Sequence, residues 1–205
     1  RTKLLRNEER IDEKEYLTDA LSRETVSFIQ RSSNSPFFIY LAYNAPHGPL
    51  QATEKYLKRY SHIKDKRRKT YAAMVSSIDD GVGDIVSALK EKNIYNNTII
   101  YFLSDNGGAK SNASNNAPLN SHKGTLYEGG IRIPFVMQWP NEIKGGTVFG
   151  KPIISLDIFA TSKAIINADL KLKNEILESL DYGVSISPRS ILIYVPINEK
   201  KLSLN

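Results

Sequence analysis

The chain has 205 residues, of which 40% are hydrophobic and 24% charged, as in an ordinary globular domain or part of a larger one. It contains no cysteine, which excludes disulfides, thiolate metal sites and a cysteine nucleophile within these residues. No apolar run approaches the ~18 residues of a membrane-spanning helix. The chain opens on Arg1 without a signal-peptide pattern, so we expect a leader or an upstream segment to be missing.

The net charge is +6 and the isoelectric point is about 9.3, which favours anionic partners. Much of the excess lies in Lys55–Lys69, where basic residues alternate with tyrosines and His62. Nucleic-acid binding is one interpretation of this patch. We favour the simpler one, a solvated helix face and loop, and expect no nucleic-acid partner.

The first third of the chain predicts a helix, a strand and a stiff loop. Residues 13–31 space their apolar side chains along one helix face. Pro36 ends this helix, because the residue before a proline avoids helical geometry. The run 37–43 is almost entirely apolar, which suits a strand buried on both faces. It leads into the loop 44–49, which has two prolines, and then into a short helix over Thr53–Tyr60 with Thr53 as its N-cap.

The middle of the chain predicts a long helix and two strands. Lys64–Lys69 is expected to be a polar connection. From Tyr71 to Leu89 the apolar side chains follow the 3.6-residue period without a break, and Asn93 is a suitable C-cap. Strands are predicted over 98–103 and 133–139, because both runs are strongly apolar.

The last third gives weaker signals. Ile153–Ile166 is expected to be a short strand that passes into a helix, Lys171–Leu180 a helix, and Ile191–Val195 a strand. The order of elements indicates an α/β sandwich with a mostly parallel central sheet flanked by helices.

Asp105 and Asn106 directly follow the predicted strand 98–103 and precede two glycines. Carboxylate and amide oxygens at the carboxyl end of a buried strand suit Ca²⁺ or Mg²⁺, although either ion needs more oxygens than this pair supplies. The alternative is an Asx-turn, in which the same side chains cap backbone N–H groups. The dipeptide alone favours the turn.

Three further positions are candidates for chemistry. His47 lies in the stiff loop after the first strand, from which it would reach the same sheet edge as Asp105 and act as an acid or hold an anionic oxygen. Lys123, between His122 and Gly124, would place an ammonium against an anion. The simpler alternatives are a surface histidine and a solvated lysine. Asp79–Asp80, inside the long helix, is expected to form structural hydrogen bonds.

Four segments, in order, resemble the type I sulfatases. They are Ala45-Pro-His-Gly-Pro49, Tyr71-Ala-Ala-Met-Val-Ser-Ser-Ile-Asp-Asp-Gly-Val-Gly83, Ser104-Asp-Asn-Gly-Gly108 and Lys123-Gly-Thr-Leu-Tyr-Glu-Gly-Gly-Ile-Arg-Ile-Pro134. The match extends from about Pro36 to Ala160 and is nearest to the arylsulfatase B or N-acetylgalactosamine-sulfatase-like branch. Four ordered motifs are far more specific than any one of them.

The resemblance implies the alkaline-phosphatase-like α/β fold and hydrolysis of sulfate esters. It implies that Asp105 and Asn106 are ligands of a Ca²⁺, with Mg²⁺ as the alternative. His47 and Lys123 would be catalytic and hold the sulfate, and one of them would assist departure of the alcohol; His122 is a further substrate-binding candidate. The implied substrate is a sulfated carbohydrate or a small aryl sulfate.

The departures from the family pattern concern its earlier half. The formylglycine of sulfatases is made from Cys or Ser in a C/S-x-P-x-R motif, and this chain contains no such motif. We therefore expect residues 1–168 to be the later part of a sulfatase catalytic domain, and residues 169–205 to be a diverged or truncated segment. On this view the formylglycine lies in the missing upstream part, and the chain alone hydrolyses nothing.

Two other functions remain open at this level. One is a non-catalytic, sulfatase-derived module that binds sulfated glycan or a metal; the other is a phosphate or phosphonate ester hydrolase of the same superfamily. Abundant Lys, Asn and Ile with no Cys favour a bacterial, periplasmic or secreted origin, or a lysosomal one in a eukaryote.

Overall fold

The computed structural model describes residues 3–168 and 190–194. Its helices are α1 (Leu17–Ser32), α2 (Glu54–Leu57), α3 (Lys66–Glu91), α4 (Glu128–Ile131) and α5 (Leu156–Ala168), with 3₁₀ turns η1 (Lys58–Tyr60), η2 (Tyr95–Asn97) and η3 (Lys110–Asn112). Its strands are β1 (Leu4–Arg6), β2 (Glu9–Ile11), β3 (Phe38–Ala42), β4 (Ile99–Leu103), β5 (Phe135–Gln138) and β6 (Ser190–Tyr194). The expected helix at Lys171–Leu180 lies outside the described residues.

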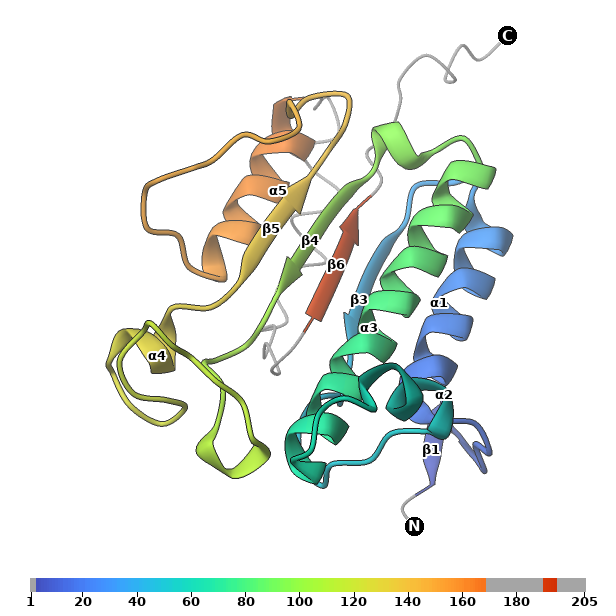
Figure 1. Cartoon of the computed structure of the whole chain (residues 1–205). Coiled ribbons are helices and arrows are strands. Elements are labelled where there is room, and N and C mark those ends of the chain that lie inside the picture. Colours follow the sequence, from blue (N-terminus) through green and yellow to red (C-terminus); the bar gives the residue numbers. More distant parts are fainter. Residues whose placement is uncertain (1–2, 169–189, 195–205) are drawn as a thin grey trace, which may run out of the picture.

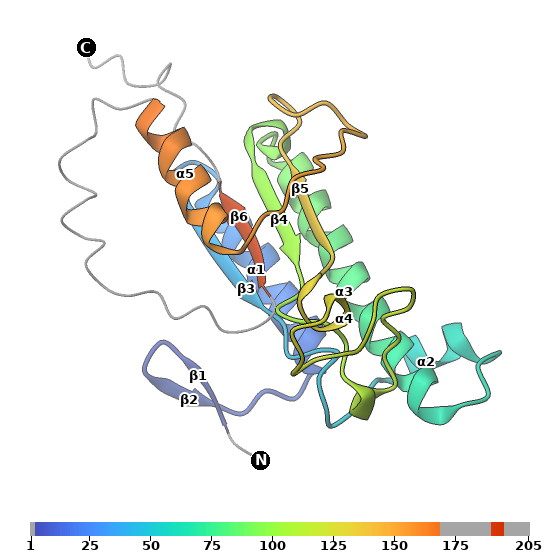
Figure 2. The same ribbon diagram turned by 90° about the vertical axis from the view of Figure 1, so that its left-hand side faces the viewer.

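The main sheet has the strand order β3-β6-β4-β5 and forms the middle layer of the molecule (Figure 1). Side chains alternate across β4, as the pleat of a strand requires. Ile100 and Phe102 join the core formed with α1 and α3, whereas Ile99, Tyr101 and Leu103 join the core formed with α5. Helices therefore cover both faces of the sheet, and the expected α/β sandwich is confirmed (Figure 2).

Strand direction differs from the expectation of a mostly parallel sheet. β6 is antiparallel to both β3 and β4, and β5 is antiparallel to β4. β3 and β4 do run the same way, because the long connection through α3 returns the chain to the same end of the sheet. An apolar run predicts that a strand is buried, but it cannot predict which strand lies beside it, and β6 comes from far along the chain.

β3 was also expected to be buried on both faces, and it is buried on one. Phe37, Ile39 and Leu41 pack into the core with α1 and α3, while Phe38 and Tyr40 on the other face are exposed. The reason is the position of α5, whose Ile158 packs against β4 and leaves the far end of that face uncovered.

The helices largely follow the sequence pattern, with shifted ends. α1 begins at Leu17 rather than near residue 13, and Lys66–Lys69 form the first turn of α3 rather than a loop. Asp65 is the N-cap, and its carboxylate accepts a hydrogen bond from the Arg68 N–H at 2.6 Å. The strand expected before α5 is absent, since Ile153–Ser155 is irregular in the structure.

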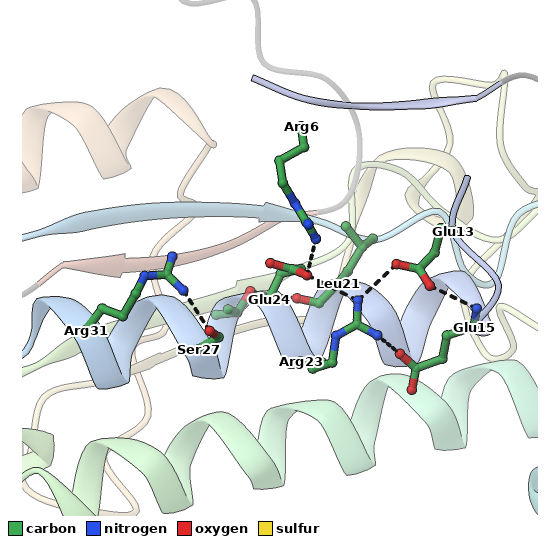
Figure 3. Close-up of polar contacts among 9 residues, drawn as sticks. Arg6, Glu13, Glu15, Leu21, Arg23, Glu24, Ser27 and Arg31 are labelled. Carbon is green, nitrogen blue, oxygen red and sulfur yellow. Dashed lines mark hydrogen bonds and ion pairs between the residues drawn. The ribbon is translucent and has the colours of Figure 1, made fainter. Parts of the chain in front are cut away.

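Ion pairs attach the segment before α1 to that helix. Arg23 bonds Glu13 at 2.9 Å and also Glu15, and Arg6 of β1 pairs with Glu24 (Figure 3). All of these side chains except Glu13 are well exposed, so the pairs contribute little stability.

Within residues 3–168 and 190–194, no helix is long and apolar enough to cross a membrane.

Candidate active site

The loops after β3 and β4 begin level with each other at one edge of the sheet, at the lower end of Figure 1. Ala42, the last residue of β3, and Leu103, the last of β4, both pair with Ser190 of β6. The two strand ends are therefore separated by two inter-strand spacings, roughly 10 Å. His47 follows the first of these ends and Asp105 the second, as the sequence predicts. Ligands of open α/β sheets bind at the carboxyl ends of such strands.

The loop with Asp105 and Asn106 is fixed by its own backbone contacts. The Ser104 hydroxyl donates to the Asn106 carbonyl at 2.9 Å, and the Asn106 side-chain amide donates to the Gly107 carbonyl at 3.0 Å. The Gly107 N–H donates to the Gly130 carbonyl at 2.9 Å, which seats the loop against α4. Asp105 and Asn106 are half-buried. The Asn106 bond differs from that of an Asx-turn, because the side chain donates to a carbonyl instead of accepting from a backbone N–H.

Gly107 is required where the loop meets α4. A Cβ on this residue would lie 1.7 Å from the Gly129 carbonyl oxygen, which is far inside van der Waals contact. The approach is that close because Gly129 is itself held, its N–H donating to the Asn120 carbonyl at 2.6 Å. Gly107 of the segment 104–108 and Gly129 of the segment 123–134 therefore allow the strand-end loop to pack directly against α4.

Lys123 is attached to the same loop through its backbone. Its N–H donates to the Gly108 carbonyl at 3.1 Å, and its side chain is half-buried. Asn116 supports this contact, because it accepts from the Gly108 N–H at 2.8 Å and donates to the carbonyls of Gly108 and Ser121. The structural role of Asn116 could not be seen in the sequence, because its partners lie on both sides of a loop.

The two candidate histidines make similar contacts. His47 Nδ1 bonds the Gly48 carbonyl at 2.7 Å, and His122 Nδ1 bonds the Lys123 carbonyl at 2.8 Å. A carbonyl only accepts, so in each ring Nδ1 bears the proton and Nε2 is the nitrogen that remains for other contacts. His47 is exposed and His122 is half-buried.

The His47 loop is joined to the Asn/Ser-rich segment after β4. The buried Asn112 donates to the Pro46 carbonyl at 3.4 Å, while Arg68 from α3 donates to the Ala113 carbonyl at 2.9 Å and Arg67 bonds the Ser111 carbonyl. Sequence reasoning missed both arginines as anchors of this segment, since it placed them in a solvated connection.

The candidate metal ligands match Ca²⁺ in type but are too few to hold it alone. Asp105 has a carboxylate, and Asn106 has an amide oxygen besides the nitrogen that donates to the Gly107 carbonyl. Ca²⁺ takes six to eight oxygens. Within the described residues, no group of three or more His, Cys, Asp or Glu side chains is placed to hold a metal. The fit is therefore that of a partial ligand set.

Asp80 has a structural role, as expected. Its carboxylate accepts two hydrogen bonds from Arg59, both at 2.7 Å, which fasten η1 to α3. The Arg59 guanidinium lowers the pKa of Asp80 from its usual value. Arg59 also donates to Ser76 and stacks on the Tyr56 ring, so this cluster is a separate feature from the strand-end site.

Comparison with known proteins identifies the family. The model of the sulfatase family matches residues 2–168, and the chain therefore belongs to the sulfatase family. It is 37% identical to mouse arylsulfatase J over 164 residues and 36% identical to mouse N-acetylgalactosamine-6-sulfatase over 172 residues. These alignments cover 78% and 80% of this chain.

A solved structure supports the same fold. The crystal structure of Ps i-CgsB in complex with k-i-k-neocarrahexaose superimposes with a TM-score of 0.80 and 47% identity, over 88% of this chain and 40% of that one. The chain spans about a third of the curated relatives, 27% of arylsulfatase J and 32% of N-acetylgalactosamine-6-sulfatase. The resemblance to sulfatases stated from the motifs is confirmed. The division of the chain at residue 168 stays a prediction.

Proposed function

We propose that these residues form part of the active site of a sulfuric ester hydrolase whose nucleophile, a formylglycine, lies outside the 205 residues. The observation that supports it best is the hydrogen bond from Lys123 to Gly108, which attaches Lys123 to the Asp105–Asn106 loop. His47 follows the strand whose end is level with that loop. Oxygen ligands and cationic donors around one strand edge are what the hydrolysis of a small anion needs.

Each candidate has a role that follows from its chemistry. Lys123 holds sulfate oxygens by its ammonium group, and His47 donates from Nε2 once protonated, to a sulfate oxygen or to the departing alcohol. His122, next to Lys123, contacts the substrate. Negative charge moves onto the leaving oxygen during the reaction, so cations fixed beforehand stabilise the transition state more than the ground state.

Asp105 and Asn106 would hold Ca²⁺, or Mg²⁺ in its place, together with ligands from outside these residues. The ion supplies positive charge that withdraws electron density from the sulfate oxygens. The hydrogen bonds of Ser104, Asn106 and Gly107 keep the loop in place for this purpose.

The proposed substrate is a sulfated carbohydrate, with small aryl sulfates as minimal substrates. The relatives are named for N-acetylgalactosamine 6-sulfate and aryl sulfates, and Ps i-CgsB was solved with k-i-k-neocarrahexaose. The net charge of +6 suits such polyanions. The proposed location is secreted or periplasmic, or lysosomal in a eukaryote.

The test is the sulfatase activity of the complete gene product toward 4-nitrophenyl sulfate and sulfated oligosaccharides. Replacing Lys123 with Ala should lower kcat/KM by about 100-fold or more, because one preorganised donor to a developing charge is worth that much. His47→Ala should act similarly. The matched controls are Lys110→Ala and His62→Ala, exposed residues on other segments.

Equal activity of Lys123→Ala and Lys110→Ala would refute the assigned role. Faster cleavage of the phosphate ester than of the sulfate ester would favour a phosphoesterase. Binding of sulfated glycan without turnover by the complete protein would favour the non-catalytic module.

A further inference from the structure

An open pocket of about 290 Å³ lies beside the His47 loop and is not part of the strand-end site. Three separate segments line it: Gly48, Pro49 and Leu50 from the loop after β3; Lys66, Arg67 and Thr70 from the start of α3; and Ser111 from η3. Gly48 directly follows His47, so the pocket opens next to the proposed reaction centre.

The pocket has a strongly cationic wall. Lys66 and Arg67 both line it, and none of its lining residues is acidic. The nearest carboxylate in the sequence, Asp65, accepts a hydrogen bond from the Arg68 backbone at 2.6 Å and is not part of the lining. Two cations without an acidic neighbour in the lining favour an anionic ligand.

Arg67 is held in place while retaining donors for a ligand. One of its terminal nitrogens bonds the Ser111 carbonyl, which anchors the side chain across the pocket wall. A guanidinium has five N–H donors, and a fixed fork of this kind matches the oxygens of a sulfate better than a free lysine does. The Thr70 hydroxyl donates to the Lys66 carbonyl at 2.8 Å, so it is engaged within α3.

The opposite wall is apolar and stiff. Pro49 and Leu50 offer CH groups there, and Leu50 also packs against the core formed by α1, β3 and α3. A bare anion makes no use of such a wall. A sulfated sugar does, because its ring presents CH groups while its sulfate reaches the cations.

Another hollow in the described part of the chain is lined by charges of both signs. It lies between α1 and α3, has a volume of about 490 Å³, and is lined by Asp19, Asp80 and Asp84 together with Arg23 and Lys55. Those aspartates lie among charges of both signs, and Tyr56 and Arg59 bond Asp19 and Asp80. This hollow is a surface groove with mixed charge.

We propose that the Lys66–Arg67 pocket binds the sulfate of a second sugar in a polysulfated glycan whose first sulfate occupies the Lys123 site. The inference rests on the proposed function and adds to it a selection of oligosaccharides over single sulfate esters. The geometry is suitable because the pocket borders Gly48, one residue from His47.

The test is calorimetric titration of the full chain with two probes, a tetrasaccharide sulfated on two separate sugars and a monosulfated disaccharide. The double variant Lys66→Gln with Arg67→Gln should raise the Kd of the tetrasaccharide about tenfold and leave the Kd of the disaccharide unchanged. The reason is that only the longer probe reaches the pocket. The matched control, Lys58→Gln with Lys64→Gln, removes the same charge from exposed positions outside the lining. Lys66→Gln alone keeps the Arg67–Ser111 bond and should give part of the effect.

Equal weakening of both probes, or no difference from the control variant, would overturn the inference. Lys123→Ala separates this outcome from failure of the proposed function. In one outcome, Lys123→Ala lowers the affinity for both probes, while the Lys66 and Arg67 variant behaves like the control. The proposed reaction site is then supported and the second subsite is refuted. In another outcome, Lys123→Ala changes neither affinity, while the double variant lowers the affinity for the tetrasaccharide. The subsite is then supported and the assigned role of Lys123 is refuted. Absence of any tetrasaccharide binding overturns the subsite, and turnover by the complete protein then decides the function by itself.

Discussion

Hydrogen bonds to backbone atoms help to position three of the candidate site residues. Lys123 is attached through its N–H, Asn106 through its amide nitrogen, and His47 through Nδ1. Such contacts leave the charged ammonium, the amide oxygen and the imidazole Nε2 for a ligand. They also do not depend on charge at neutral pH, so the loops keep their shape when the ligand is absent.

The ionisation of Tyr56 is coupled to the stability of the fold. Its side chain is 1% exposed, and its hydroxyl donates to Asp19 at 2.6 Å. Burial, followed by the bond to Asp19, raises the pKa of Tyr56 to about 12. The phenol therefore keeps its proton in the folded protein at a pH where the unfolded chain, with a pKa near 10, loses it.

We predict that this difference destabilises the chain in alkali. A pKa raised by folding contributes stability that is complete below the unfolded value, about 10, and is lost as the pH rises toward 12. Tyr56→Phe should therefore show a smaller fall in the free energy of unfolding between pH 9 and pH 11 than the unchanged chain. Urea denaturation at both pH values measures it.

Tyr60→Phe is the matched control for this prediction, since Tyr60 is half-buried and belongs to the neighbouring turn. An equal fall in the free energy of unfolding between pH 9 and pH 11 in Tyr56→Phe and in the unchanged chain would contradict the prediction. The phenol of Tyr56 would then not be the cause of the destabilisation.

At the scale of elements, the contact between α1 and α3 depends on one glycine. A Cβ at Gly81 would lie 2.1 Å from the Ser22 hydroxyl and 2.7 Å from the Tyr43 hydroxyl, and those two hydroxyls bond each other at 2.7 Å. Glycine at this position lets α3 approach α1 and β3 closely. The motif that resembles the sulfatases thus has a packing role here, apart from any catalysis.

We predict that Gly81→Ala costs about 1–3 kcal/mol of unfolding free energy, the usual range for inserting a methyl group into a packed contact. Gly83→Ala is the control in the same helix. It has nothing within 4 Å of the added Cβ, and it should stabilise by about 0.5–1 kcal/mol through helix propensity. Chemical denaturation of both variants gives the comparison. A stabilising Gly81→Ala would mean that the two helices are not packed as described.

At the scale of the whole molecule, apolar side chains remain exposed on both faces of the sheet. Phe38 on β3 is 58% exposed and Val136 on β5 is 59% exposed, while Leu126, beside Lys123, is 91% exposed. Among residues 3–168 and 190–194, α5 packs against β4 and β5 on one face, and α1 with α3 pack on the other without contacting Val136. Large apolar side chains left exposed in this way associate with other apolar surfaces in water.

We predict that the 205-residue chain by itself binds the dye ANS and self-associates as its concentration rises. Phe38→Thr with Val136→Thr should reduce both signals, because threonine keeps strand propensity while removing apolar area. Fluorescence and sedimentation measure the effect, with Thr147→Ser in an irregular segment as the control. A chain that stays monomeric and binds no dye would show that these surfaces are covered in solution.

Much of this architecture follows from local pattern. The 3.6-residue period around Ile85 predicted α3, and the apolar runs predicted β3, β4, β5 and β6 to within a few residues, because these patterns reflect burial of one face or of both. The four motifs predicted the family. The pairing of β6 between β3 and β4 and the anchoring by Arg67 could not be predicted, since they join residues far apart in the chain.

The sequence by itself determined which residues follow the strands, and so placed His47 after β3 and Asp105 and Asn106 after β4. Order along the chain and hydrophobic period are local properties, and they survive any arrangement of the strands. Only the tertiary structure decided that the Lys123 N–H donates to the Gly108 carbonyl and that the Lys66–Arg67 pocket opens beside the His47 loop. The physical reason is that such contacts depend on backbone direction and on close approach at glycine, which a linear pattern does not encode.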